Sequence, residues 1–387
     1  MSNVGRQFPS EITTFVDETS GRTIKQLTKS GCNVHFYFTE NSYTLGDKEI
    51  IYKHTNEGEK IAELYAMDLE TGVRTQLTDF AAWGIDNIGF VTKTNDSKYI
   101  VFIAGDKVYK LERGTENLMH LYTAPFGFKF FGGNISFDNR YVAFALNEIV
   151  DYHRQFSGKN YDGFNERYYK QKRGKIVVIY MDGSGGETIV DDTCQVAHVQ
   201  FAPDTNEFLS YCHEGPWNLV TQRIWMVNTV TRRVMPCFRQ DAPDSVGHEF
   251  WTRDGLVFFD NRGPGHDGTI TADRKQAFAE ASESAIPCIG FADKDCNIVR
   301  YLEVPFYCNH YHASIDNTKL VGDALDDLML IDISTDTPKM EVLCKHGTSW
   351  ESQSTHPHPT FSWSNDSILY ASDKDEQGKP QLYLIEL

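Results

Sequence analysis

The chain has 387 residues, of which 40% are hydrophobic and 13% aromatic, as is usual for a globular protein. Its formal net charge of −17 argues against nucleic acid as a partner, because nucleic-acid-binding proteins present a basic face. No stretch approaches the roughly 18 apolar residues of a membrane-spanning helix, and Met1–Asp17 lacks the apolar run of a signal peptide, so we expect no membrane partner and a cytoplasmic location.

The eight cysteines are scattered along the chain without a C-x-x-C pair. Several lie in apolar, strand-like surroundings, as Cys212 does after Leu209-Ser-Tyr. In a chain of this length such a distribution indicates reduced, buried thiols rather than a disulfide framework. This expectation agrees with a cytoplasmic location.

Hydrophobic runs of period 2 recur along the chain, each after a short polar turn, and this is the pattern of β-strands. Most of them are followed by a second hydrophobic run, as in Glu63–Met67, Arg223–Val227, Leu328–Ile331 and Gln381–Ile385. Only Thr271–Ser284 has the pattern of a long amphipathic helix. In chain order, the first runs of the repeats are Glu49–Lys53, Tyr99–Ile103, Tyr141–Ala145, Glu207–Tyr211, Gly255–Phe259, Lys319–Gly322 and Ser367–Ala371.

The seven repeats are spaced roughly 40 to 60 residues apart, which is the range of four-stranded propeller blades. We therefore predict an all-β fold, a seven-bladed β-propeller that forms one domain over residues 1–387. Six or eight blades are the alternatives, because Ile149–Lys175 is irregular enough to contain an inserted loop.

The two ends of the chain are predicted to complete one blade together. Phe15–Thr28 resembles Ala66–Thr78, the outer half of a blade, and the chain ends at Leu387 directly after a predicted third strand. We expect Thr23–Leu27 to supply the missing outer strand of the last blade, which removes the open sheet edges.

Histidines stand at the start of the predicted inner strands in four repeats, at His198, at His248, at His310 and at the pair His356 and His358. The same position in consecutive blades of a propeller faces the same central channel. We therefore expect these side chains to converge on one polar site, although the fold alone does not define the reaction. A set of hydrogen-bonded channel histidines without a metal is the alternative.

The sequence Gln-Ser-Thr-His-Pro-His-Pro near the C-terminus indicates a metal site. Residues i and i+2 of an extended chain point to the same side, so His356 and His358 can meet one ion, and Gln353 adds an oxygen. Neutral nitrogen and oxygen ligands without a thiolate favour Mn²⁺, Ca²⁺, Zn²⁺ or Fe²⁺. Another H-x-H pair supplies a further ligand, either His310 or His312.

His248 is a candidate general base, because imidazole titrates near neutrality. Its alternative role is to fix the strand Glu249–Trp251. Arg223 lies next to an apolar run, and it either clamps a carboxylate with two hydrogen bonds or forms an ion pair between blades.

The segment Tyr211–Trp217 combines a turn with aromatic and imidazole groups and is predicted to face a sugar. His213 and Trp217 in this segment, together with His198, are the candidate substrate-binding residues, although Trp217 fits the core equally well. The chain has no G-x-S-x-G nucleophile elbow and no glycine-rich phosphate loop, which argues against those classes of enzyme.

Four groups of residues follow one another in the chain: Tyr211–Trp225, Gly247–Trp251, Cys308–His310 with Asp316 and Val321–Asp323, and Gln353–Pro359. Together they resemble the oligogalacturonate lyases, which are cytosolic seven-bladed propellers of pectin breakdown. Their order and spacing extend over about half of the chain, whereas the N-terminal third resembles propellers in general. Asp151–Arg154 has no counterpart in the family.

The resemblance implies a catalytic site as well as a fold. Members of the family cleave small α-1,4-linked galacturonate oligomers, digalacturonate and longer, by β-elimination and release unsaturated monouronate. The resemblance implies that His248 removes a proton and that Arg223 assists at the uronate. This chain has His312 where the family has a non-ligating apolar residue, so the choice between His310 and His312 stays open. The manganese ligands it implies are His310, Gln353, His356 and His358, and other divalent cations suit them too.

The residues themselves also suit this chemistry, independently of the resemblance to the family. The C5 hydrogen of a uronate is weakly acidic because the resulting anion spreads onto the C6 carboxylate, and a divalent cation on that carboxylate stabilises it. Charges further away than about 8 Å are largely screened at physiological salt, so the acidic exterior does not prevent binding. Two other functions stay open, namely a lyase for another uronate oligomer and a propeller that binds a partner without catalysis.

Overall fold

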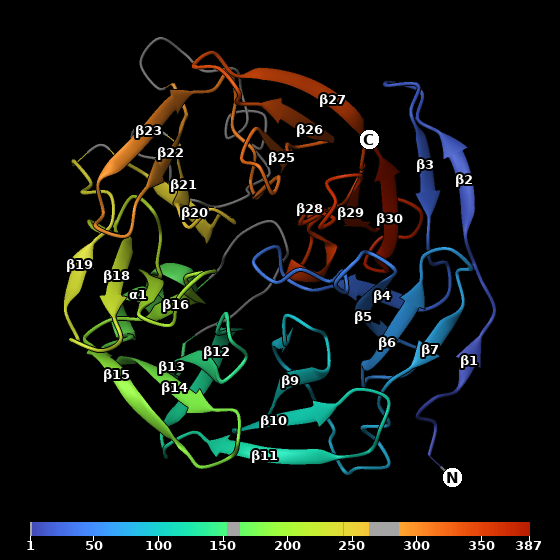
Figure 1. Ribbon diagram of the computed structural model, residues 1–387, viewed down its shortest axis with the longest axis horizontal. Helices are drawn as coiled ribbons and strands as arrows, with labels where there is room; N and C mark the ends of the chain where they lie inside the picture. Colours follow the sequence, from blue (N-terminus) through green and yellow to red (C-terminus); the bar gives the residue numbers. More distant parts are fainter. Residues whose placement is uncertain (1, 153–162, 243, 263–285) are drawn as a thin grey trace. The chain divides into compact units, whose positions relative to one another are not determined.

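The computed structural model describes residues 2–152, 163–242, 244–262 and 286–387. In these ranges the chain forms seven sheets of four or five strands (Figure 1). Each of the predicted first runs forms a strand and pairs with the run that follows it, so the prediction of seven blades, rather than six or eight, is confirmed. The helix predicted over Thr271–Ser284 lies outside the described residues.

The described chain divides into two compact units. The first contains residues 1–119, 309–333 and 339–387, and the second contains residues 120–308 and 334–338. The single domain over residues 1–387 is not tested by this division and stays a prediction.

Four sheets belong to the first unit, with the strand orders β1-β7-β6-β5-β4, β11-β10-β9-β8, β2-β3-β30-β29-β28 and β24-β25-β26-β27. The last residues of β11 continue into the second unit. A single 3-10 turn, η1 (Gln353–Thr355), precedes β28. The strands are β1 (Gln7–Phe8), β2 (Thr13–Val16), β3 (Thr23–Gln26), β4 (Cys32–His35), β5 (Glu49–Thr55), β6 (Glu63–Asp68), β7 (Arg74–Gln76), β8 (Val91–Lys93), β9 (Tyr99–Ala104), β10 (Lys107–Glu112), β11 (Leu118–Thr123), β24 (Tyr311–Ala313), β25 (Lys319–Asp323), β26 (Asp327–Asp332), β27 (Lys339–Lys345), β28 (Thr360–Phe361), β29 (Ser367–Ser372) and β30 (Gln381–Glu386).

The two ends of the chain meet in one sheet of the first unit. Strand β3 pairs antiparallel with β30, with Ile24 opposite Ile385, and the blue and dark red ribbons of these strands lie side by side in Figure 1. Both isoleucines are fully buried in a cluster that also contains Tyr370 and Tyr383. The prediction that Thr23–Leu27 completes the last blade is therefore confirmed, and β30 has no open edge.

Three sheets belong to the second unit, with the strand orders β12-β13-β14-β15, β16-β17-β18-β19 and β20-β21-β22-β23. In the irregular segment Ile149–Lys175, the described residues carry a short helix, α1 (Phe164–Lys170). No helix in the described ranges has the length and hydropathy that crossing a membrane requires. The strands are β12 (Phe128–Ile135), β13 (Tyr141–Glu148), β14 (Gly174–Tyr180), β15 (Gly186–Asp192), β16 (Val196–Phe201), β17 (Phe208–His213), β18 (Ile224–Asn228), β19 (Val234–Pro236), β20 (Val246–Trp251), β21 (Val257–Asn261), β22 (Cys288–Ala292) and β23 (Ile298–Glu303).

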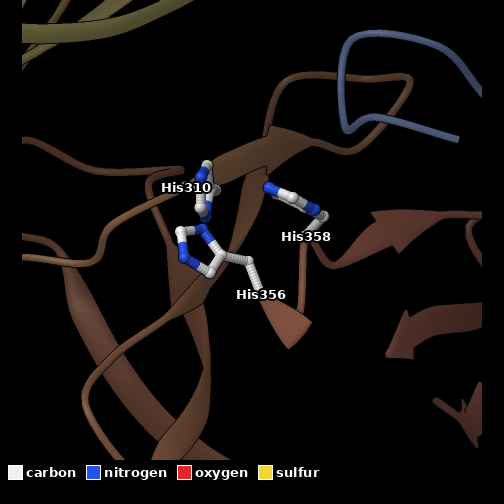
Figure 2. Close-up of side chains that lie close together, drawn as sticks. All are labelled: His310, His356 and His358. Atoms are coloured by element: carbon white, nitrogen blue, oxygen red, sulfur yellow. The ribbon is translucent and has the colours of Figure 1, made fainter. Parts of the chain in front are cut away.

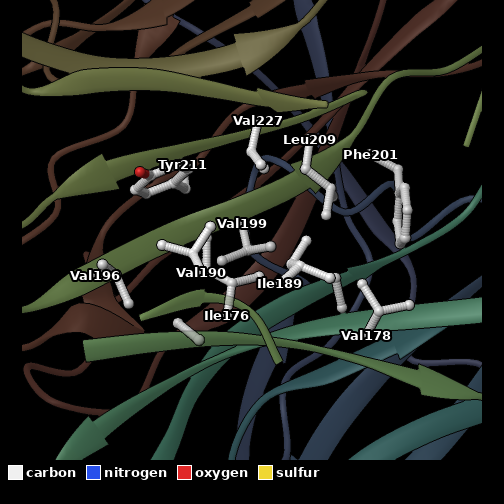
Figure 3. Close-up of a cluster of buried hydrophobic side chains, with 12 residues drawn as sticks. Ile176, Val178, Ile189, Val190, Val196, Val199, Phe201, Leu209, Tyr211 and Val227 are labelled. Carbon is white, nitrogen blue, oxygen red and sulfur yellow. The ribbon is translucent and has the colours of Figure 1, made fainter. Parts of the chain in front are cut away.

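The core of the second unit forms where the faces of neighbouring sheets pack together. Figure 3 shows one such cluster, in which Ile176 and Val178 of β14 and Val199 of β16 interdigitate with Leu209 and Tyr211 of β17. Because both faces of these sheets are covered, the central strands are buried along most of their length, as β13 is. This explains why the runs are nearly continuous in hydrophobic residues.

The turn between the first two strands of a sheet has a recurring design. A hydroxyl side chain donates to the carboxylate two residues later, as Thr94 does to Asp96 at 2.6 Å and Ser314 does to Asp316 at 2.7 Å. The residue after this carboxylate has a positive φ in several turns, as Asn317 has (54°). Asparagine tolerates this left-handed conformation, which is why polar turns separate the hydrophobic runs.

Two inner strands of the second unit carry a β-bulge at a histidine. The register shifts between Ala197 and Gln200 in β16 and between Val246 and Glu249 in β20, so His198 and His248 lie inside the bulges. The sequence predicts these residues at the starts of the strands, whereas the structure places them within the strands. A bulge re-aims a side chain out of the ladder, and this positions both imidazoles for the site described next.

Candidate active site

Three histidines meet in the first unit. His310 lies directly before β24, and His356 and His358 lie between η1 and β28. One ring nitrogen from each lies within 4.8 Å of the others, and all three side chains are buried. Figure 2 shows the three rings turned toward one another. The structure thus brings together three of the four residues that the sequence predicts as metal ligands.

A buried carboxylate orients the first of these rings. Nδ1 of His310 lies 2.8 Å from Oδ2 of Asp323, the last residue of β25, and the backbone N–H of His310 donates to the same carboxylate. Burial raises the pKa of Asp323 to about 8, although the N–H groups of His310 and His358 oppose this shift. A carboxylate at Nδ1 fixes the orientation of the imidazole and directs Nε2 as the candidate metal-binding atom, as is usual for metal-binding histidines.

The residues present fit a divalent cation. Nε2 of His358 is buried and has no hydrogen-bond partner among the described residues. Burial, together with the neighbouring His310 and His356 rings, lowers the pKa of His358 well below its usual value, so this ring is neutral and offers a lone pair. One nitrogen from each ring lies within 4.8 Å of the other two, whereas ligands of one ion with bonds of about 2.1 Å lie roughly 3 to 4 Å apart, so small side-chain movements suffice to bind it.

Aromatic rings enclose the three histidines. The ring centre of Trp350 lies 5.0 Å from that of His356, the ring of Tyr37 lies 4.9 Å from that of His358, and the ring of Phe38 lies 5.3 Å from that of His310. Such a wall excludes water from the sides of the cluster and fixes the imidazole orientations.

The structure distinguishes between the two histidines of the Cys308–His312 segment. His310 belongs to the cluster, whereas Nδ1 of His312 accepts a hydrogen bond of 3.2 Å from the backbone N–H of Phe361. Gln353 begins η1 with an exposed side chain. Its role as a fourth ligand stays a prediction.

Replacing Asp323 by asparagine is expected to weaken metal binding by about 10- to 100-fold, the usual effect of losing the partner of a metal-bound histidine. Asparagine has the same shape but never carries the negative charge that Asp323 gains as the pH rises through its pKa of about 8, and this charge strengthens metal binding by the His310 imidazole. Titration calorimetry with Mn²⁺ on the metal-free protein measures this change. An unaltered affinity would contradict the assigned role of Asp323.

Arg223 lies at the centre of a second polar cluster, in the second unit. Its side chain is 1% exposed, its Nε lies 3.3 Å from Glu249, and its Nη2 lies 3.5 Å from Glu214. Burial alone would raise the pKa of Glu214, but Arg223 and His198 outweigh this effect and lower it. Nη1 of Arg223 is buried and has no hydrogen-bond partner among the described residues. Arg223 therefore forms ion pairs between two sheets, as one alternative predicted, and still has a donor available.

Three more of the predicted residues lie in this cluster. The rings of His198 and His248 stack with their centres 5.7 Å apart, and Nδ1 of His198 lies 2.9 Å from Glu249. Trp217 is buried and packs edge-on against His248, with ring centres 5.6 Å apart. The structure thus gathers His198, Trp217, Arg223 and His248.

Arg262, Asp260 and Tyr307 also belong to this cluster, and they were not predicted from the sequence. The guanidinium carbon of Arg262 lies 3.3 Å from the ring centre of Trp217 and 3.4 Å from that of Tyr307. Its Nε donates to Asp260 at 3.0 Å, and its Nη2 lies 3.3 Å from Nδ1 of His248. The available signal was a charged residue directly after the apolar strand that contains Asp260.

His213 lies elsewhere in the second unit. Its Nε2 is 2.9 Å from Asp192, and its ring packs on Trp225 with ring centres 4.9 Å apart. Asp192, Cys194 and His213 form a group of their own, separate from the pair His198 and His248. The substrate-binding role of His213 stays a prediction.

Comparison with known proteins assigns the family. A model of the oligogalacturonate lyase family matches residues 2–387. The chain belongs to this family. The oligogalacturonide lyase of Pectobacterium atrosepticum is 24% identical over 417 residues, which span 99% of this chain and 98% of that protein. The oligogalacturonate lyase of Dickeya dadantii is 23% identical over 406 residues, with the same coverage. The predicted family, and with it an enzyme of this type, is confirmed.

Solved structures of oligogalacturonate lyases share the fold. One, in complex with manganese, superposes with a TM-score of 0.85 at 22% identity and covers 100% of this chain and 98% of its own. Another, from Vibrio parahaemolyticus, has a TM-score of 0.83 at 22% identity, with coverages of 99% and 98%. The predicted all-β fold, a seven-bladed β-propeller, is confirmed.

Proposed function

We propose that this protein is a lyase that cleaves short α-1,4-linked galacturonate oligomers, digalacturonate and longer, by β-elimination and releases unsaturated monouronate. The observation that carries the proposal is the buried cluster of His310, His356 and His358, backed by Asp323, in a chain of the oligogalacturonate lyase family. The manganese complex of a protein with the same fold supports a divalent cation in this cluster.

The proposed ligands are His310, His356 and His358, with Gln353 as the fourth, and the proposed ion is Mn²⁺ or another divalent cation. All four are neutral, so the ion keeps its full charge despite the net charge of −17. When bound, such an ion supplies positive charge to the C6 carboxylate of a uronate and so stabilises the negative charge that develops as the C5 proton leaves.

In the proposed reaction His248 takes the C5 proton of the uronate. The electron pair of that C–H bond forms the C4=C5 double bond, and the C4–O bond to the departing sugar breaks with its electrons on oxygen. The free Nη1 of Arg223 is suited to hold a carboxylate oxygen, because a buried guanidinium donates a charge-assisted hydrogen bond. Trp217, His198 and His213 are the proposed substrate-binding residues.

Product analysis tests the proposed function. Purified protein with Mn²⁺ and digalacturonate is expected to give a new ultraviolet absorbance from a conjugated double bond, or a keto-uronate detected chemically. Rhamnogalacturonan and alginate fragments serve as the competing substrates. If neither product forms from digalacturonate, the pectin assignment fails, and product from another uronate alone would identify a lyase of different specificity.

We also propose a cytoplasmic location, no nucleic-acid partner and no membrane partner. All eight cysteines lie in the described ranges and form no disulfide there, and Cys212, Cys237, Cys308 and Cys344 are buried. Eight thiols without a disulfide suit a reducing compartment.

A further inference from the structure

Arg262 is held by three groups at once, all in the second unit. Its side chain is 1% exposed, with the guanidinium between the rings of Trp217 and Tyr307 and the Nε atom bound to Asp260. In addition, Nη2 of Arg262 lies 3.3 Å from Nδ1 of His248. A guanidinium that contacts two aromatic rings and is bound to a carboxylate has little freedom to turn away.

We propose that Arg262 is a positioning residue that keeps His248 uncharged and fixes the tautomer of its imidazole, and that Asp260 sets the strength of this effect. Its meaning for catalysis rests on the proposed role of His248 as the base. The contact itself does not depend on that role.

The tautomer of His248 follows from which of the two side chains, Arg262 or His248, can donate a hydrogen bond. A guanidinium only donates hydrogen bonds, so Nδ1 of His248 is the acceptor in the contact of 3.3 Å. In a neutral imidazole the proton then lies on Nε2. The lone pair of the resting base is therefore covered by Arg262, and because Arg262 is held in place, proton transfer to Nδ1 requires the imidazole of His248 to move away from it.

The charge state follows from electrostatics. A fixed positive charge about 4 Å away from an imidazole opposes its protonation, because two like charges repel strongly in a site with little water. Asp260 partly neutralises this charge through its contact with Nε. A Cβ atom built on Gly247 would lie 2.5 Å from both carboxylate oxygens, so the Asp260 carboxylate lies against the backbone directly before His248.

The other charged and titratable groups that the described residues place near His248 or Arg262 have contacts of their own. His198 stacks on the ring, but its Nδ1 is bound to Glu249. Arg223 is paired with Glu249 and Glu214. Tyr307 contacts the guanidinium of Arg262. Burial, although opposed by Arg262, raises the pKa of Asp260 to about 6, so its negative charge is present only above that pH.

Two substitutions test the proposal because they are expected to act in opposite directions. Arg262→Gln removes the positive charge and is expected to raise the pKa of His248 by about one unit, a tenfold change in protonation. Asp260→Asn keeps an acceptor for Nε of Arg262 but removes the compensating charge, so it is expected to lower the pKa of His248. General damage to the site does not produce shifts of opposite sign. Arg140→Gln, an exposed arginine paired with Asp138, is the matched control.

The pKa of His248 is read directly by NMR on full-length protein labelled with ¹³C and ¹⁵N in histidine and loaded with diamagnetic Zn²⁺. The signal of His248, one of 13 histidines, is identified by its absence in His248→Gln. Two-bond ¹H–¹⁵N correlations are expected to show the proton on Nε2 in the wild type. Equal shifts in both variants, no shift, or a proton on Nδ1 would overturn the proposal.

The pH dependence of turnover separates this inference from the proposed function. A base acts in its unprotonated form, so the acidic limb of kcat/KM is expected to move to higher pH in Arg262→Gln and to lower pH in Asp260→Asn. If the NMR pKa moves and the acidic limb does not, the positioning role stands and His248 is not the base.

Discussion

Replacing His310 by alanine is expected to remove bound metal from the protein, whereas replacing His312 by alanine leaves the metal in place. Of these two histidines, His310 is the one whose ring nitrogen lies within 4.8 Å of those of His356 and His358. His312 serves as an acceptor for the backbone of Phe361. Elemental analysis after exhaustive dialysis measures the retained metal. Loss of a residue that only hydrogen-bonds to a metal ligand lowers metal affinity by up to roughly 100-fold. His310→Ala removes a ligand itself, so its loss in affinity is expected to be larger.

The two variants are matched because the residues lie two positions apart. Asp323, which loses its imidazole partner in His310→Ala, is buried and has a pKa of about 8, so it can take up a proton instead of remaining as an unpaired charge. Circular dichroism confirms that both variants fold. Full metal retention by His310→Ala, or loss of metal from His312→Ala, would show that the assigned ligand set is incorrect.

Replacing His248 by glutamine is expected to reduce kcat on digalacturonate by about 10²- to 10⁴-fold, the usual contribution of a general base. Glutamine keeps a hydrogen-bonding side chain of similar length at the bulge of β20 but cannot take a proton near neutral pH. Metal content is expected to remain that of the wild type, since His248 is not among the proposed ligands. Stopped assays with product quantification at saturating substrate measure the loss in kcat.

His120→Gln is the matched control for this experiment. His120 is an exposed histidine on β11 whose Nε2 lies 2.9 Å from Thr123, and it is not among the proposed site residues. Its substitution is expected to leave turnover within a factor of about two, as is usual for surface changes. If His248→Gln retained the turnover of this control, another group would have to act as the base.

The strands were predictable because short hydrophobic runs alternate with polar turns along the chain. Tyr141–Ala145 is such a run, and the strand that contains it, β13, is buried along most of its length. The pairing of Thr23–Leu27 with the last strand was predictable because two distant segments share a pattern. The bulges at His198 and His248 were not, since one extra residue in a strand leaves no mark in the alternation.

The candidate site was predictable to the extent that its residues are close in sequence. The spacing of His356 and His358 indicates that they bind one ion. The sequence also offered His310 and His312, and only the structure shows that His310 joins the cluster. Arg262 was missed because the rings that hold it, Trp217 and Tyr307, lie 45 residues away on either side in the chain. Nothing near Arg262 in the sequence distinguishes a clamped guanidinium from one in solvent.

The pairing of β3 with β30 has a consequence for how this protein is made. A ribosome synthesises β30 long after β3, so the sheet that follows His356 and His358 gains its outer strands only once the residues between them have been made. Until then the nascent chain exposes an edge that is ready to pair with a neighbouring polypeptide. Synthesis of β30 is thus the step after which this part of the molecule is less prone to aggregation.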